Sequence, residues 1–273
     1  MKKLLFLFLL INISCHNIGN FEFKPIECSP EQMPKFDAEK VTIIDDNGNR
    51  LRDTIVGQIE KKRTVFQPCR VLIYDAVWKS SDNNVITKSK IKMVAMGKRW
   101  KYQPEKQDVV TIQFEYTNKE FEKCKKFGLN KTLPLGHWKG QVEEGVIENV
   151  ERIWMHPFRH NQFSFTEVAP FPEVRFPLAK GKSWTNQLSI ETGWGDWSNS
   201  SGNSQYEVVG QEMIEIPFGK IKNCWKVKSQ AVYPFGVSYF DYWFDEDLGF
   251  VKMEYKNYGN QTLSFELAAM IDE

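Results

Sequence analysis

The sequence predicts an all-β protein, in which one short helix accompanies an antiparallel sheet. The C-terminal half contains six segments rich in β-branched and aromatic residues, at positions 182–192, 205–216, 220–232, 237–244, 250–258 and 262–269. Short connections with turn residues, such as Pro217-Phe218-Gly219 and Gly259-Asn260, join them. Short links between successive strands give an antiparallel meander. No strand–helix alternation is present, which argues against a Rossmann-like fold.

The first 15 residues have the pattern of a secretory signal peptide. Two lysines precede an apolar run that ends at Ile11, and Cys15 follows the small residue Ser14. A cysteine at this place resembles the lipobox of bacterial lipoproteins, although Asn12 and Ile13 depart from the strict motif. Such relaxed boxes are similar to those of Bacteroidetes envelope lipoproteins. The resemblance implies lipidation of Cys15; the alternative is a secreted protein cut near Ser14 or Gly19 without a lipid.

Charge and composition set the expected compartment and domain organisation. Removing residues 1–15 deletes two lysines and changes the formal net charge from +1 to −1, so the basic excess of a nucleic-acid-binding protein is missing. We expect a cell-envelope lipoprotein anchored through Cys15, at the periplasmic or surface face of the outer membrane. Residues 16–36, which contain three prolines, would be a tether. Residues 37–273 would form a single β domain with a subdomain seam near residues 128–140.

The N-terminal half predicts further strands and the helix. Alternating residues around an Asn-Gly pair at 47–48 predict a hairpin over residues 40–57. Thr117 and Glu120 form a capping box and Gly128 is a stop signal, so a helix of about ten residues is expected between them. Runs of β-branched and aromatic residues predict strands at 70–79, 85–96, 98–103, 108–117, 146–155 and 162–168.

The stretch from Glu151 to Trp184 joins the two halves and is rich in proline and aromatic residues. It contains Pro157, Pro170, Pro172 and Pro177. Because proline lacks a backbone donor and fixes φ, no helix can run through the whole stretch, and any strand in it must be short or at an edge. We expect an ordered crossing with aromatic side chains packed beneath it.

Four cysteines follow residue 15, namely Cys28, Cys69, Cys124 and Cys224. In an oxidising compartment this even number permits two disulfides in three connectivities, and we expect at least one. None has the CxxC spacing of a redox motif or a zinc knuckle. Cys69 is alternatively a small buried hydrophobe, and alternation along its strand places Cys224 on the polar face with the neighbouring lysines.

A further resemblance covers residues 171–269. It is carried by Phe176-Pro-Leu-x-x-Gly-Lys-x-Trp184, Tyr206-Glu-Val-Val-Gly-x-Glu212, Pro217-Phe-Gly219, Tyr242-Trp-Phe and Leu248-Gly-Phe-Val-Lys252. These motifs look like those of envelope domains without an assigned activity, similar to the half-barrels of the LolA/LolB lipoprotein carriers. The resemblance implies a strongly curved antiparallel sheet, a half-barrel or open barrel. It supplies no catalytic residues.

The loop that begins at Gly193 is the candidate ligand-binding surface. Trp194 and Trp197 flank Asp196 in a Gly- and Ser-rich segment, where two tryptophans are difficult to bury. Exposed aromatic faces beside a carboxylate suit stacking on a sugar ring or holding an apolar ligand. Alternatively, the tryptophans fold back and plug the open end of the curved sheet, because tryptophan is highly buried on average.

Metal sites are not supported by the pattern. His156 and His160 would share a face only on a helix, which Pro157 forbids, and satisfied structural histidines are the default. Of the acidic residues Asp241, Asp245, Glu246 and Asp247, the first lies in a predicted strand and the other three predict a solvated turn. We expect no metal ion and no cofactor.

The sequence therefore favours a non-enzymatic envelope lipoprotein that binds an apolar or glycan ligand, on the concave face of the sheet or at the Trp194 and Trp197 loop. The alternatives are a hydrolase acting on envelope glycans and a structural subunit of an outer-membrane assembly. A large apolar concavity would favour the carrier. An acid pair facing a cleft would favour the hydrolase, and a flat exposed patch the subunit.

Overall fold

The computed structural model describes residues 19–45, 50–134 and 138–272. The predicted signal peptide with Cys15 and the Asn-Gly turn at 47–48 lie outside these ranges. Within them, no helix has both the length and the apolar character of a membrane span.

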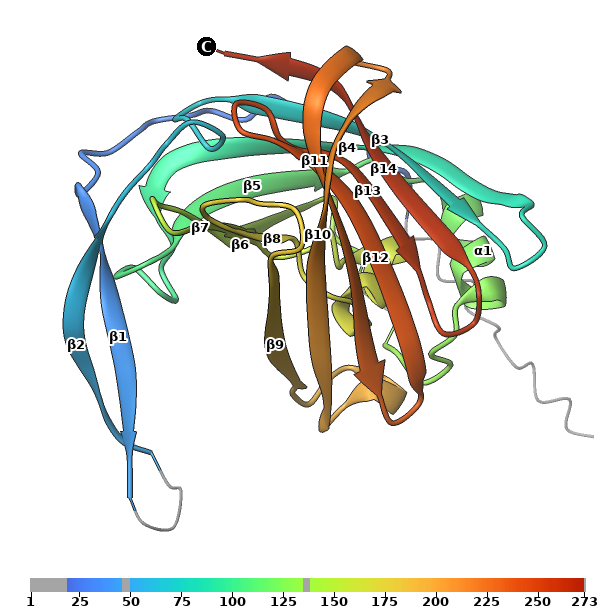
Figure 1. Cartoon of the computed structure of the whole chain (residues 1–273). Coiled ribbons are helices and arrows are strands. Elements are labelled where there is room, and N and C mark those ends of the chain that lie inside the picture. The colour runs from blue at the N-terminus through green and yellow to red at the C-terminus, as the bar shows by residue number, and fades with distance from the viewer. Residues whose placement is uncertain (1–18, 46–49, 135–137, 273) are drawn as a thin grey trace, which may run out of the picture.

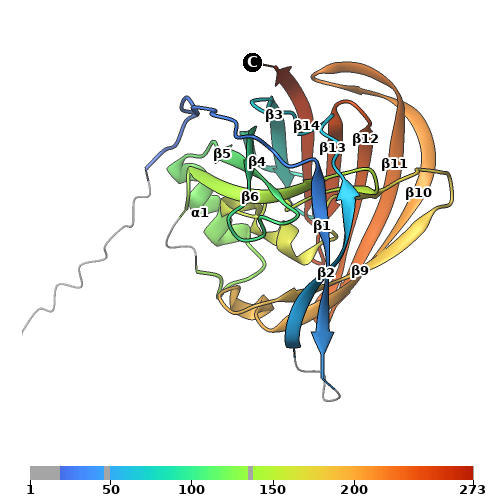
Figure 2. The ribbon, with the colours of Figure 1, turned by 90° about the vertical axis from the view of Figure 1, so that its left-hand side faces the viewer.

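Twelve antiparallel strands form one sheet in the order β8-β7-β6-β5-β4-β3-β14-β13-β12-β11-β10-β9. The pairing of β3 with β14 joins the N- and C-terminal halves. In Figures 1 and 2 the sheet curves around the segment that follows β7, which confirms the predicted all-β fold. The strands are β3 Val71–Lys79, β4 Val85–Arg99, β5 Asp108–Phe114, β6 Gln141–Glu148, β7 Arg152–Met155, β8 Glu173–Arg175, β9 Ser183–Ile190, β10 Ser200–Ile216, β11 Gly219–Tyr233, β12 Gly236–Asp245, β13 Gly249–Lys256 and β14 Thr262–Ile271.

The sheet is an open barrel, because its edge strands β8 and β9 do not pair with each other. Side chains link these edges instead of a backbone ladder. The Arg175 guanidinium of β8 donates to Asn186 Oδ1 of β9 over 2.7 Å. Lys182 Nζ donates to the Arg175 carbonyl over 2.9 Å. The two edges of the sheet therefore meet through polar side chains.

The predicted helix is α1, Asn118–Phe127, and its capping box is present. Glu120 accepts a hydrogen bond from the Thr117 N–H over 2.6 Å, which satisfies a donor that the helix leaves unpaired. Phe121 and Cys124 turn toward the protein and are buried. Gly128 ends the helix with φ −57°, in extended backbone and not in the left-handed conformation typical of a glycine stop.

The N-terminal strands differ from the prediction in three places. Residues 85–103 were expected to form two strands, but β4 runs through Gly97, whose φ of +61° accommodates an irregular register. Residues 146–155 divide into β6 and β7. The predicted strand at 162–168 is wrong, because Asn161–Val168 forms the 3-10 helix η1 between Pro157 and Pro170.

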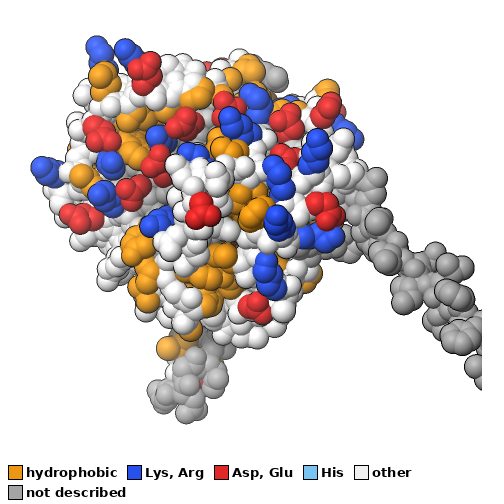
Figure 3. Space-filling view, turned by 90° about the vertical axis from the view of Figure 1, so that its right-hand side faces the viewer, with side chains coloured by type: hydrophobic (Ala, Val, Ile, Leu, Met, Phe, Trp, Pro, Cys, Tyr) orange, Lys and Arg blue, Asp and Glu red, His pale blue; other side chains and the backbone are white. Residues whose placement is uncertain are grey.

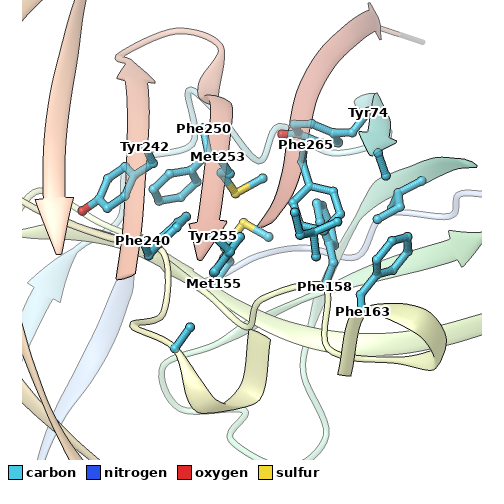
Figure 4. Packing of buried hydrophobic residues seen from close by; sticks show 14 of the residues in the cluster. Tyr74, Met155, Phe158, Phe163, Phe240, Tyr242, Phe250, Met253, Tyr255 and Phe265 are labelled. Atoms are coloured by element: carbon cyan, nitrogen blue, oxygen red, sulfur yellow. The ribbon is translucent and has the colours of Figure 1, made fainter. Parts of the chain in front are cut away.

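The crossing segment fills part of the concave face. Phe158 and Phe163 point from this segment toward Phe265 of β14, with ring centroids 5.1 and 5.3 Å away (Figure 4). Phe158 also contacts Tyr74 of β3 at 5.3 Å. All four side chains are buried. Burial of large aromatic side chains is among the strongest contributions to a core, so the concave face over β3 and β14 is the protein's own interior.

The β1–β2 hairpin, Phe36–Ile44 with Arg50–Glu60, stands apart from the sheet (Figure 1). Its base is fixed by a buried ionic group around Asp37. That carboxylate accepts hydrogen bonds from Lys61 at 3.0 Å, Arg99 at 2.7 Å and Asn149 at 3.1 Å. Because the charges are paired and hydrogen-bonded, their burial is tolerated.

The described part of the predicted tether, residues 19–36, contacts the body at more than one point. Phe21 forms a β-bridge with Tyr116, and its N–H donates to the Tyr116 carbonyl over 2.8 Å. Cys28 is disulfide-bonded to Cys69, with 5.6 Å between the Cα atoms. At least one disulfide was predicted, and this one confirms it. The apolar ring and the covalent link hold the segment in place.

Cys124 and Cys224 are buried thiols. The placement of Cys224 on the polar face of its strand is wrong. Asn223 has a φ of +59°, and the register between β10 and β11 shifts beside it. This irregularity breaks the period of two and turns Cys224 into the core.

Replacing Cys28 and Cys69 together with serine is expected to lower the free energy of unfolding by about 2 to 4 kcal/mol. The bridge closes a loop with a sequence separation of 41 residues, and a cross-link of this span restricts the unfolded chain. Urea denaturation of the oxidised protein and of the variant gives the difference. A Cys124→Ala variant retains the bridge and serves as the control. Equal midpoints for the serine variant and the parent would contradict the prediction.

The outer surface mixes both signs of charge. On the face in Figure 3, Lys and Arg side chains lie among Asp and Glu, without a large area of one sign. Lys252 pairs with Glu266 at 3.1 Å between neighbouring strands. In the acidic turn after β12, Asp245 accepts hydrogen bonds from the N–H groups of Asp247 and Leu248, both at 3.0 Å. The predicted solvated turn is confirmed.

Candidate functional site

A cavity of about 710 Å³ occupies the part of the concave face that the crossing leaves open. It lies where β6 and β7 face β9 and β10, next to the meeting edges of the sheet. The loop between β4 and β5 and the start of the crossing complete its wall. We call this space the concave cavity. Open ends of curved sheets are common ligand sites, because the strands form a rigid concave surface and their side chains line it.

Aromatic rings form one wall of the concave cavity. Trp154 contacts His156 with ring centroids 4.6 Å apart, and Trp100 contacts the same imidazole at 5.4 Å. Phe171 lies 6.0 Å from Trp154. Tyr206 lines the opposite side. Flat aromatic faces of this kind stack against sugar rings and other planar or apolar surfaces.

A buried ionic network forms the floor. Arg159 donates to Glu144 through Nε and Nη2, each at 3.1 Å, and to Glu167 through Nη1 at 3.1 Å. His160 Nε2 lies 2.8 Å from the same Glu144 carboxylate. His156 Nδ1 is 3.2 Å from Glu144 Oε2, although outside hydrogen-bond geometry. One arginine thus holds two glutamates beneath the aromatic wall.

The ionic network shifts the pKa values of Glu144, His156 and Glu167 in different directions. Burial by itself would raise the pKa of Glu144, but the hydrogen bond from His160 and the positive charge of Arg159 outweigh it and lower the pKa to about 2. Burial, helped by Arg159, lowers the pKa of His156 to about 4. Burial raises the pKa of Glu167, and Arg159 opposes that shift. At neutral pH Glu144 is therefore an anion and His156 is neutral.

Acidification is expected to destabilise the protein through His156. Its pKa in the folded state lies below the ordinary value of 6.5, so the unfolded chain binds the proton more tightly. The stabilisation is complete above pH 6.5 and is lost as the pH falls to about 4, by roughly 3 kcal/mol. Thermal unfolding of the parent and of a His156→Gln variant, measured across this range, gives the difference. Identical pH slopes in the two proteins would contradict the assignment.

Two polar atoms at this site are buried without a hydrogen-bond partner among the residues that the structure describes. They are Trp100 Nε1 and Gln107 Oε1, and both side chains line the concave cavity. The Gln107 amide is oriented by its Nε2, which donates to Gln103 Oε1 over 2.9 Å. A buried donor or acceptor without a partner costs about 1 to 3 kcal/mol, so a polar ligand would relieve this cost.

The edge strands contribute a second polar group. Glu173 of β8 is buried and accepts hydrogen bonds from Arg175 at 3.1 Å and from the Asn186 amide of β9. Ser204 lies nearby on β10. Lys106 reaches the lining from the β4–β5 loop, and burial followed by the charge of Arg152 lowers its pKa. The lining therefore combines both charge signs with amides, hydroxyls and aromatic rings.

The structure separates the two tryptophans that were predicted to act together. Trp194 is half-buried and lines the concave cavity. Trp197 is only 2% exposed and donates from Nε1 to the Tyr258 hydroxyl over 2.9 Å. Asp196 is exposed and accepts a hydrogen bond from Thr132 at 2.6 Å, away from the lining. Trp197 therefore lies in the core, as in the alternative in which the loop tryptophans fold back, and Asp196 makes a contact within the loops.

His156 and His160 do lie close together, although without a helix to align them. Both approach Glu144. Among the residues in the described ranges, no group of three or more His, Cys, Asp or Glu side chains is arranged to hold a metal ion. Arg159 occupies the position between the carboxylates, so the cluster is an ion-pair network.

Several lining residues were missed at the sequence level. Trp100 and Gln107 lie in the β4–β5 loop, which is distant in sequence from the crossing. Asn186 lies on a predicted strand and belongs to no motif. The signal that did exist was the composition of the stretch from Glu151 to Trp184, which supplies the aromatic wall and the ionic floor.

Two solved structures resemble the chain at low sequence identity. A crystal structure from Bacteroides fragilis, described as an exported protein with a YmcC-like fold, is 14% identical over 76% of this chain and 97% of that chain, with a TM-score of 0.45. A crystal structure from Parabacteroides distasonis, described as a lipoprotein, is 13% identical over 77% of this chain and 100% of that chain, with a TM-score of 0.41. No protein-family model and no curated protein matches the sequence. These likenesses give no information about a ligand.

Proposed function

We propose that the protein is a non-enzymatic envelope lipoprotein that binds a glycan in the concave cavity. The observation that carries this proposal is the pair of buried, unpartnered polar atoms, Trp100 Nε1 and Gln107 Oε1, beside an aromatic wall. A sugar offers a ring face for Trp154 and hydroxyl or amide groups for Trp100 Nε1 and Gln107 Oε1. Sugars are bound through this combination of stacking and hydrogen bonding.

The composition of the lining favours a glycan over a lipid. An acyl chain gains affinity from apolar area, and it would leave Lys106 and the unpartnered atoms without a polar group to contact. The lining also holds Glu167 and Glu173, so charges of both signs are present. A glycan that carries amides and ionised groups matches this surface better than a hydrocarbon does.

The state of the carboxylates favours binding over hydrolysis. A glycosidase needs one carboxylic acid and one carboxylate free to reach the scissile bond. Glu144 and Glu167 share Arg159, and Glu173 is held by Arg175 and Asn186. Their hydrogen bonds are directed to the protein, which suits a structural role.

Calorimetric titration with three probes tests the proposal. A soluble peptidoglycan disaccharide-peptide and a lipopolysaccharide core oligosaccharide represent the two kinds of envelope glycan, and palmitate is the apolar comparison. We expect one glycan to bind and a Trp154→Ala variant to bind it at least about tenfold more weakly, roughly 1.4 kcal/mol. Tyr239→Ala, on the outer face of β12, is the control and should not change affinity.

Several results would overturn the proposal. They are binding of palmitate alone, unchanged affinity in the Trp154 variant, and cleavage of the glycan during incubation.

The membrane anchor at Cys15 is tested separately by the intact mass of the membrane-fraction protein. A lipidated N-terminal Cys15 is expected, and an unmodified mature protein in the aqueous phase would contradict it.

A further inference from the structure

A second cavity, of about 280 Å³, lies beneath the end of α1 and beside η1. Its lining residues differ from those of the concave cavity. Asn130, which lines it, donates to the Trp194 carbonyl over 2.7 Å, so the loop that carries Trp194 and Trp197 separates the two spaces. We call this space the α1 cavity. The α1 cavity shares no lining residue with the concave cavity, so a ligand in one is independent of the function proposed for the other.

Two buried polar atoms at the α1 cavity have no partner in the described part of the chain. Trp78 and Gln162 are each 1% exposed, and both line the cavity. The unpartnered atoms are Trp78 Nε1, a donor, and Gln162 Oε1, an acceptor. Gln162 Nε2 donates to Ser89 Oγ over 3.3 Å, which fixes the orientation of the amide. Each unpaired atom at such depth is costly, and each is relieved by a ligand group.

Other polar side chains at this cavity are already paired within the protein. The Asn257 amide donates to Gln261 Oε1 over 3.1 Å, and Gln261 Nε2 donates to the Phe127 carbonyl over 2.8 Å. Their hydrogen bonds hold the wall in place. The cavity thus offers one donor and one acceptor in particular, at Trp78 and Gln162.

The remaining wall combines apolar and polar side chains, and its charged members are basic. Cys124, Leu129 and Phe165 provide apolar surface, while Lys125 and Lys131 are the charged lining residues among those described. A cation is therefore disfavoured. An ordered water needs two to four polar partners, and the side-chain hydrogen bonds of Asn257 and Gln261 are directed to the protein.

We propose that the α1 cavity binds a small, mainly apolar, uncharged molecule with one end that both accepts and donates a hydrogen bond, such as a primary amide. The carbonyl oxygen of the amide accepts from Trp78 Nε1, and its N–H donates to Gln162 Oε1. The apolar body lies against Cys124, Leu129 and Phe165. The volume suits a bicyclic aromatic amide.

The experiment follows the indole N–H resonance of Trp78 in ¹⁵N-labelled protein during titration with 2-naphthamide. The resonance is assigned by its loss in a Trp78→Phe variant. We expect it to move downfield as the new hydrogen bond forms, whereas the indole resonance of Trp243, whose Nε1 already donates to Glu212, stays in place. Naphthalene, which lacks the polar end, and 2-naphthylmethylamine, a cation, should bind about tenfold more weakly or not at all.

A Gln162→Met variant keeps the side-chain volume and removes the acceptor, and it should bind 2-naphthamide about fivefold to tenfold more weakly. The comparison of probes on the parent protein remains decisive if this variant does not fold. A Trp78 resonance that none of the probes moves would identify a water-filled void and overturn the proposal. Equal affinity for 2-naphthamide and naphthalene would also overturn it, because Trp78 Nε1 and Gln162 Oε1 would then contribute nothing to binding.

Discussion

Replacing Trp197 with alanine is expected to lower the free energy of unfolding by about 3 to 5 kcal/mol, the usual cost of removing a large aromatic side chain from a core. Trp197 is buried, its ring lies 6.4 Å from that of Phe235, and its Nε1 donates to Tyr258. The substitution leaves a cavity and removes the hydrogen-bond donor. Chemical denaturation monitored by circular dichroism measures the loss.

Trp194 is the matched control, three residues earlier in the same loop. Its half-buried ring lines the concave cavity, so Trp194→Ala should cost about 1 kcal/mol or less in stability. The same change should weaken glycan binding if that proposal is correct. Equal destabilisation by the two substitutions would show that the loop acts as one packed unit, and the division between core and lining would then be wrong.

The strands of the C-terminal half could be predicted because their local signals agree with the tertiary structure. All six predicted segments are strands, β9 to β14. Turn residues separate them, and each strand pairs with the next one along the chain as a meander. The helix was also predictable, since the Thr117 and Glu120 capping box acts within one turn of backbone. Local chemistry decides these elements, and distant residues need not be known.

Irregular backbone limited the prediction elsewhere. The orientation of Cys224 depends on the positive φ of Asn223, a single residue that reverses the alternation after it. The 3-10 helix η1 replaces a predicted strand because its residues fill the concave face instead of pairing at an edge. A hydrophobic segment can pair as a strand at a sheet edge or pack into the concave face. The space inside the curved sheet decides between the two, and the sequence of one segment does not encode that space.

The candidate site was predictable only in part, for a related reason. The crossing from Glu151 to Trp184 was recognised from composition, and it supplies Trp154, His156 and Arg159 to the concave cavity. The difference between Trp194 and Trp197 follows from their contacts with Asn130 and Tyr258, which lie more than 60 residues away. Exposure of a loop tryptophan is thus set by long-range packing that sequence patterns do not report.

Replacing Arg159 with methionine is expected to destabilise the protein by about 3 to 5 kcal/mol at pH 7. Arg159 is the cation shared by Glu144 and Glu167, and removing one member of a buried ionic group leaves the others uncompensated. Methionine retains much of the apolar stem, so the lost charge dominates the effect. Urea denaturation at pH 7 provides the measurement.

Two comparisons separate charge from packing in this variant. In Arg159→Met the missing cation lets burial raise the carboxyl pKa values, so the unfolded chain binds protons less tightly than the folded one, and the penalty should shrink as the pH falls toward 4. Adding Glu144→Gln and Glu167→Gln removes the uncompensated charges and should restore most of the stability at pH 7. A penalty that is the same at both pH values, and that the two glutamines do not reduce, would assign the loss to packing of the Arg159 side chain and would contradict the ionic floor.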